Sequence, residues 1–110
     1  MPLFSQYRAM WLFAMFDLPV NDKKSRRAYT QFRKALLKQG FTMMQYSIYA
    51  RQVPREEADL SLRRRVRLSL PDVGQVRLMS ITDRQFAKMD VFIGRKRKDP
   101  EPVPLQRLLF

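Results

Sequence analysis

The chain has 110 residues, of which 22 are Lys or Arg and 10 are Asp or Glu, giving a formal net charge of +12. This length suits one domain with a modest core, which oligomerisation would help to stabilise. The chain contains no Cys and no His, which excludes disulfides, thiolate zinc sites and the commonest general base. Any catalysis must therefore rest on carboxylates, hydroxyls, basic side chains and hard cations such as Mg²⁺.

The positive charge is spread along the whole chain. Residues 1–50 carry eight basic and two acidic residues, and residues 51–110 carry fourteen and eight. A folded body this basic suits a polyanionic partner, most simply nucleic acid. Neither a secretory signal peptide nor an apolar run long enough to span a membrane is evident, so we expect a cytoplasmic protein.

The first predicted element is the most hydrophobic. Residues 8–17 alternate between two faces that are both apolar, which predicts a central strand covered on both sides. Pro19 ends this strand, and a single carboxylate, Asp17, stands at its last position.

A helix is predicted over residues 22–39, with Asn21 or Asp22 placed to cap its N-terminus and Gly40 to stop its C-terminus. Its apolar side faces a core, and its opposite side is basic. Most basic helix faces are simply solvated, but only Asp22 offsets the charge here, so this side is a candidate nucleic-acid-binding surface. The candidate residues are Lys23, Arg26, Arg27, Arg33, Lys34 and Lys38.

Strand and helix then alternate again. Residues 41–53 predict one strand or two short strands with an irregularity near Gln45, and Pro54 opens a second helix. That helix carries first-turn acids, including Asp59, and an arginine cluster near its end; both complement the helix dipole, so we rank this cluster lower as a nucleic-acid contact. The later elements are a strand at 75–82, a short helical turn at 83–89 and a short strand at 90–94.

A charged, proline-containing segment follows. We predict a domain over residues 1–94 and an extended basic arm over residues 95–110. A second candidate nucleic-acid patch lies in the arm and consists of Arg95, Lys96, Arg97 and Lys98. The apolar ending "LQRLLF" is expected to dock on another surface, for example as an added edge strand.

The element order predicts the fold class. Strand, helix, strand, strand, helix, strand is the order of an α+β ferredoxin-like β-α-β-β-α-β sandwich, here with a fifth short strand and the C-terminal arm. Both helices would lie on one face of an antiparallel sheet. The other face would be partly apolar, and a second copy of the chain is the simplest cover.

Asp17 allows two interpretations. It can be a helix cap or a turn residue, because a proline turn follows it. Alternatively, two copies of Asp17 across a two-fold axis could share one Mg²⁺, since a single carboxylate binds this ion weakly. Such an ion could activate a water at a scissile phosphate, which makes Asp17 the candidate catalytic and metal-binding residue.

The motifs "MFDLPV", "RRAYTQFRKALLKQGFTMMQYSIYAR" and "GQVRLMSITDRQF" occur in this order. Together they resemble the CRISPR-associated protein two family, whose members are described as endoribonucleases and adaptation proteins, and the arm resembles versions from type II systems. The resemblance implies a ferredoxin-like homodimer with a C-terminal strand that crosses to the partner. It also implies that Asp17 is the proposed Mg²⁺ ligand at the dimer interface.

The same resemblance leaves several functions open. One is spacer acquisition, in which the dimer binds duplex DNA and bridges dimers of the CRISPR integrase, with or without cleavage of RNA or DNA. One alternative is a toxin-like, metal-dependent endoribonuclease acting on messenger RNA; another is a non-catalytic nucleic-acid-binding scaffold. Genome context would separate these, because an adjacent integrase gene and repeat array favour spacer acquisition.

Overall fold

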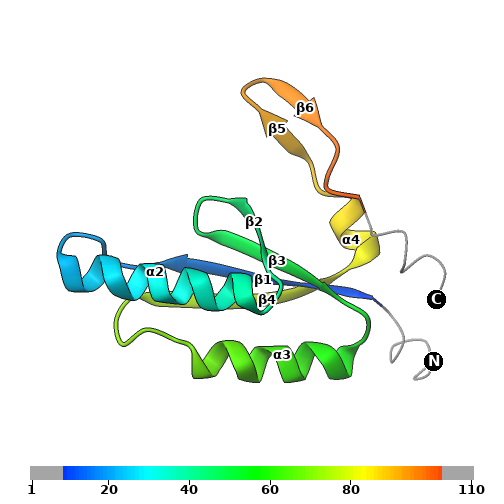
Figure 1. Ribbon diagram of the computed structural model, residues 1–110. Helices are drawn as coiled ribbons and strands as arrows, with labels where there is room; N and C mark the ends of the chain where they lie inside the picture. Colours follow the sequence, from blue (N-terminus) through cyan, green and yellow to red (C-terminus); the bar gives the residue numbers. More distant parts are fainter. Residues whose placement is uncertain (1–8, 103–110) are drawn as a thin grey trace.

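Residues 9–102 are described by a computed structural model, in which the elements from β1 to β5 follow one another in the predicted order (Figure 1). They are β1 (Met10–Asp17), α2 (Lys23–Lys38), β2 (Thr42–Gln45), β3 (Ile48–Val53), α3 (Glu56–Leu68), β4 (Gln75–Thr82), α4 (Asp83–Ala87), β5 (Val91–Ile93) and β6 (Lys96–Lys98). β1 to β4 form an antiparallel sheet in the order β2-β3-β1-β4. The α+β class is confirmed, and this sheet order is compatible with the predicted ferredoxin-like sandwich.

β1 is the central strand that its two apolar faces predict. It pairs with β3 on one side and with β4 on the other. Leu12 and Ala14 are fully buried on the face toward α2 and α3, and Trp11 and Phe13 are buried on the opposite face. The even-numbered and the odd-numbered residues of β1 therefore belong to two separate apolar clusters, because successive side chains of a strand point to opposite faces.

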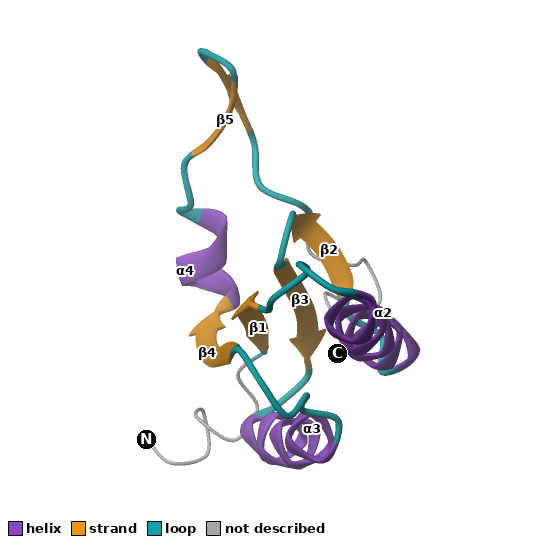
Figure 2. Cartoon of the chain, turned by 90° about the vertical axis from the view of Figure 1, so that its left-hand side faces the viewer, coloured by secondary structure: helices purple, strands orange, loops and turns teal. Residues whose placement is uncertain are grey.

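The helices are divided between the two faces of the sheet. Figure 2 shows α2 and α3 on one side of the sheet and the short α4 on the other. Phe32 and Leu36 of α2 and Leu62 of α3 are buried in the larger cluster. Phe86 of α4 stacks on Trp11, with ring centroids 3.9 Å apart, so α4 covers part of the face that the longer helices leave open.

Local contacts at both ends of α2 confirm its predicted limits. The Asp22 carboxylate accepts a hydrogen bond of 2.7 Å from the Ser25 backbone N–H, which lowers the pKa of Asp22. At the other end, Arg51 Nη1 donates a 2.7 Å hydrogen bond to the Gln39 carbonyl, where a cation complements the helix dipole. Gly40 follows with a φ of +90°, which glycine adopts readily.

Two predicted boundaries are refined in the middle of the chain. The segment 41–53 forms two strands, and the pairing register shifts between Met43 and Gln45, so the predicted irregularity is confirmed. The second helix begins at Glu56, with Arg55 at the N-cap, two residues beyond the Pro54 start that the sequence indicated. Within residues 9–102, no helix combines the length and apolar character needed to cross a bilayer.

The segment after α4 differs from the prediction. The expected fifth strand is β5, but it lies outside the main sheet and pairs with β6 in a hairpin. The sequence predicts an unpaired arm at residues 96–98, because a run of charged residues shows no apolar periodicity. The hairpin forms nevertheless, since backbone hydrogen bonds between strands do not require apolar side chains. Gly94, with a φ of +63°, permits the two-residue turn between the strands. The division at residue 94 stays a prediction, and "LQRLLF" lies outside the described residues.

Candidate metal and nucleic-acid site

Asp17 occupies the end of β1, beside the start of β4. It pairs in register with Gln75, and its side chain is exposed. The preceding residue, Phe16, is buried against the helices, so the alternation of the strand directs Asp17 to the other face of the sheet. Asp22 caps α2, and the Asp17 side chain forms no hydrogen bond or ion pair within residues 9–102. Its carboxylate therefore remains available for a ligand.

Two loops hold the backbone around Asp17. The Phe16 N–H donates a 3.1 Å hydrogen bond to the Ser47 carbonyl, which lies in the turn between β2 and β3. On the other side, Gly74 packs so closely that a Cβ atom there would stand 2.8 Å from the Asp17 carbonyl oxygen. Residues from three segments thus fix the backbone position of Asp17.

A shallow pocket of about 320 Å³ opens at this end of the sheet. Its polar lining includes Asp17, Tyr46, Ser47, Gln75 and Arg77, and its apolar lining comes from β1 and β3. Among residues 9–102, no group of three or more carboxylates is placed to hold a metal ion. One exposed carboxylate fits a hard cation in part only, because Mg²⁺ prefers six oxygen ligands. The site fits the ion if a second copy of the chain supplies another carboxylate, as the sequence predicted.

The predicted basic surface on α2 is largely present as exposed charge. Lys23, Arg26, Arg27, Lys34 and Lys38 are all exposed. Arg26 Nη1 also donates a 3.3 Å hydrogen bond to the Val20 carbonyl at the start of the helix. These residues lie on α2, which covers the same face of the sheet as α3 (Figure 2).

Arg33 has a different environment from the other α2 cations. It is half-buried, and its Nε donates a 2.8 Å hydrogen bond to the hydroxyl of Tyr49, which is itself buried. The Tyr49 hydroxyl in turn donates to Met43 Sδ at 3.4 Å. Arg33 therefore joins α2 to β3 and β2, and its contribution to nucleic-acid binding stays a prediction.

The second predicted patch lies on the hairpin. Arg95, Lys96, Arg97 and Lys98 are exposed, and Arg97 forms an ion pair of 3.1 Å with Asp90. The hairpin projects from the body beyond α4 (Figure 1). Its apolar residues Phe92 and Ile93 are also exposed. The structure does not bring this patch together with the residues on α2 within one chain.

A family model described as "CRISPR associated protein Cas2" matches residues 10–89, which include β1 to β4 and their helices. The chain belongs to this family. The predicted resemblance is confirmed.

Curated Cas2 relatives match along nearly the whole chain. A "CRISPR-associated endoribonuclease Cas2" of Parvibaculum lavamentivorans is 46% identical over 102 residues, covering 92% of this chain and 100% of the relative. A protein with the same description from Flavobacterium psychrophilum is 42% identical over 96% of this chain and 92% of the relative. Another, from Streptococcus mutans, is 34% identical over 92% of each chain.

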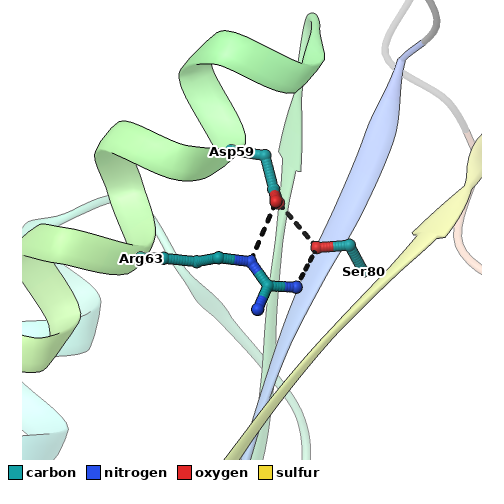
Figure 3. Close-up of polar contacts among 3 residues, drawn as sticks. All are labelled: Asp59, Arg63 and Ser80. Atoms are coloured by element: carbon teal, nitrogen blue, oxygen red, sulfur yellow. Dashed lines mark hydrogen bonds and ion pairs between the residues drawn. The ribbon is translucent and has the colours of Figure 1, made fainter. Parts of the chain in front are cut away.

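The sequence did not reveal one partly buried polar cluster of this Cas2-family chain. Asp59, interpreted as a first-turn acid, accepts a 2.9 Å hydrogen bond from Arg63 Nε and a 2.7 Å hydrogen bond from Ser80 Oγ (Figure 3). Arg63 Nη2 also donates to Ser80 Oγ at 2.5 Å. Asp59 is only 7% exposed. The four-residue spacing of Asp59 and Arg63 was a visible signal for the pair, whereas Ser80 comes from a distant strand.

Proposed function

We propose that the chain acts as a homodimer in CRISPR spacer acquisition, where it binds duplex DNA and bridges dimers of the CRISPR integrase. The observation that carries this proposal is the Cas2-family match over residues 10–89. The exposed cations of α2 support it, because a basic face can grip phosphates without reading bases. The net charge of +12 per chain supports it further.

Apolar side chains that are exposed on the single chain support the homodimer. α4 covers only part of one sheet face, and Met79 on that face remains exposed. The hairpin adds exposed Phe92 and Ile93 at a distance from the core. Light scattering after gel filtration should give twice the monomer mass for the full chain. A monomer at micromolar concentration would contradict the proposed pairing.

DNA binding is tested by fluorescence anisotropy with one duplex over a series of salt concentrations. Wild type should bind with little sequence preference and with a steep salt dependence. The double variant Arg27→Ala/Lys34→Ala should bind more weakly, with a salt slope lower by about 2, one for each lost phosphate contact. The matched control is Arg64→Ala/Arg65→Ala, which removes two exposed cations from α3. A larger effect in the control would move the interface to α3.

Integrase bridging has its own test. The full chain should co-purify with a CRISPR integrase when the two are co-expressed, and duplex DNA should increase the yield of the complex. Removal of residues 105–110 tests the prediction that "LQRLLF" docks on the dimer or on the integrase. Unchanged dimer mass and unchanged integrase capture after this deletion would contradict the docking prediction.

A second candidate function is Mg²⁺-dependent endonuclease activity on RNA or DNA. The name "endoribonuclease" of the relatives and the unengaged Asp17 carboxylate favour it. In this mechanism Asp17 from each subunit would bind the ion, which supplies an activated water and stabilises charge on the phosphate. Arg77 in the same pocket would bind a phosphate oxygen and orient the strand.

The test of catalysis compares wild type with Asp17→Asn, which keeps the size of the side chain and removes its charge. Both proteins are purified side by side and assayed on RNA and on duplex DNA, with Mg²⁺ or with EDTA. Wild type should cleave only with Mg²⁺, and Asp17→Asn should lose cleavage. Equal activity in the two proteins would exclude Asp17 as the catalytic group.

A further inference from the structure

Among residues 9–102, Arg33 is the only cation of α2 that is bonded to a side chain of the sheet. Its Nε donates a 2.8 Å hydrogen bond to the hydroxyl of Tyr49. Arg27 and Lys34, by contrast, form no side-chain hydrogen bond or ion pair within the same residues. Such free side chains lose rotamer freedom when they bind a ligand, whereas the fold has already restricted the side chain of Arg33.

Tyr49 is a rigid anchor for this bond. It is 1% exposed, its ring stacks on Phe16 with centroids 5.6 Å apart, and its backbone pairs with Ala14 of the central strand. Its hydroxyl donates its single proton to Met43 Sδ at 3.4 Å, which leaves the oxygen lone pairs for Arg33 Nε. The ring, the hydroxyl and the direction of its proton are thus all fixed by contacts within the fold.

The need to satisfy a buried hydroxyl does not by itself explain the bond. Buried tyrosine hydroxyls usually find a partner, but the hydroxyl of Tyr49 already has one in Met43. Arg33 keeps contact with solvent, so water could equally satisfy its Nε. What the bond from Arg33 to Tyr49 adds is a fixed orientation of the guanidinium.

The bond uses one side of the guanidinium and leaves the other available. Within the described part of the chain, Arg33 forms no hydrogen bond or ion pair through Nη1 or Nη2. The guanidinium is planar and holds its five N–H donors in a rigid fork, so a fixed Nε also fixes the direction of both Nη groups. Two parallel N–H donors of this kind can bind two oxygens of one phosphate.

We propose that Tyr49 is a positioning residue, which holds Arg33 ready to bind one phosphate of the duplex backbone through both Nη groups. This inference rests on the proposed DNA binding by α2 and deepens it, because it names a phosphodiester group as the ligand of Arg33. The exposed cations of α2 supply charge. Arg33 supplies a contact whose geometry is set before the DNA arrives, and the buried tyrosine is the reason.

The experiment measures binding of the full chain to one blunt DNA duplex by fluorescence anisotropy, in EDTA and at several salt concentrations. The variants are Tyr49→Phe, Arg33→Ala, Arg33→Lys and the double variant Tyr49→Phe/Arg33→Ala. Tyr49→Phe keeps the packed ring and removes only the hydroxyl. Ser80→Ala is the matched control, because it also removes a hydrogen-bonded hydroxyl from the sheet, but one whose bonds go to α3.

We expect Tyr49→Phe to bind the duplex about 2-fold to 12-fold more weakly, the cost of ordering one long side chain on binding. Its salt slope should stay close to that of wild type, because the charge of Arg33 remains. Arg33→Ala should lower the salt slope by about 1. In the double variant the loss of the hydroxyl should add nothing further, since the tyrosine acts only through Arg33.

Two further variants separate orientation from charge and from stability. Arg33→Lys keeps the charge but lacks the rigid fork. It should keep the salt slope and bind at least as weakly as Tyr49→Phe. Ser80→Ala should bind the duplex like wild type, even if it unfolds at a lower urea concentration.

An NMR measurement tests the orientation without any DNA. The Nε–H signal of Arg33 is identified by its absence in Arg33→Lys. In wild type this proton should exchange slowly with water, because it is held by a buried hydroxyl. In Tyr49→Phe it should exchange at the rate of the other, exposed arginines.

Three outcomes would overturn the inference. The first is unchanged duplex affinity in Tyr49→Phe. The second is an equal loss from Tyr49→Phe in the wild-type and Arg33→Ala backgrounds, which would mean that the hydroxyl does not act through Arg33. The third is the same Nε–H exchange rate in wild type and Tyr49→Phe. Failure of wild type to bind the duplex would instead refute the proposed DNA binding itself, whatever the exchange rate of Arg33.

Discussion

The cluster of Asp59, Arg63 and Ser80 gives the sharpest stability prediction. Arg63→Met keeps the aliphatic stem of the side chain and removes the guanidinium. Asp59, 7% exposed, then retains only the hydrogen bond from Ser80. Breaking a buried ion pair by removing one partner costs about 3–5 kcal/mol. Because 33% of the Arg63 side chain is exposed and water can replace part of the interaction, we expect a loss of about 2–3 kcal/mol.

The assay is urea unfolding at one fixed protein concentration, because dimerisation would couple stability to concentration. Asp59→Ala and the double variant Asp59→Ala/Arg63→Met complete a cycle. The double variant should be more stable than the sum of the single losses predicts, by at least about 1 kcal/mol. Arg64→Met is the matched control: Arg64 is exposed on the same helix and should change stability by less than about 0.5 kcal/mol.

Two results would refute this reasoning. One is a loss in Arg63→Met no larger than in Arg64→Met, which would mean that the ion pair contributes nothing measurable. The other is strict additivity of Asp59→Ala and Arg63→Met, which would mean that the two side chains act independently. Either result would remove the cluster as the link between α3 and β4.

Two further predictions concern the ends of β1 and α2. Gly74→Ala should destabilise the fold by about 2–4 kcal/mol in thermal or urea unfolding, since its φ is +93° and the added Cβ meets the Asp17 carbonyl oxygen. Gly94→Ala is the control, because Gly94 has a φ of +63° but an added Cβ there would meet nothing within 4 Å beyond its chain neighbours. A loss of stability in Gly94→Ala as large as in Gly74→Ala would contradict the packing argument. The hydrogen bond from the Ser25 N–H lowers the pKa of Asp22 in the folded state. The contribution of Asp22 to folding stability is therefore fully present above the unfolded pKa near 3.8, and it is lost as the pH falls through the lower folded pKa. Unfolding midpoints of wild type and Asp22→Ala should therefore differ at pH 7 and converge as the pH falls below 3.8; a constant difference would exclude this linkage.

The sequence by itself determined those structural features that depend only on residues close together in the chain. The apolar alternation of residues 8–17 predicted a central strand, and a cap at Asn21 or Asp22 and a stop at Gly40 predicted the limits of α2. The order of elements predicted the α+β class. The apolar run before Asp17 and the proline after it predicted that this carboxylate stands at the end of a strand. These features are local, because the period of a strand or helix and the geometry of a cap are set within a few residues.

The tertiary structure alone decided the partners of residues far apart in the chain. Arg33 looked like one more exposed cation, but it bonds to Tyr49, 16 residues away. Ser80 lies 21 residues from the Asp59 carboxylate that it reaches. Tyr46 lies in the turn between β2 and β3, and its ring stacks on Tyr29 of α2, 17 positions earlier in the chain. Such contacts depend on how helices pack on a sheet, and the periodicity of one segment contains no information about the segment that it will meet.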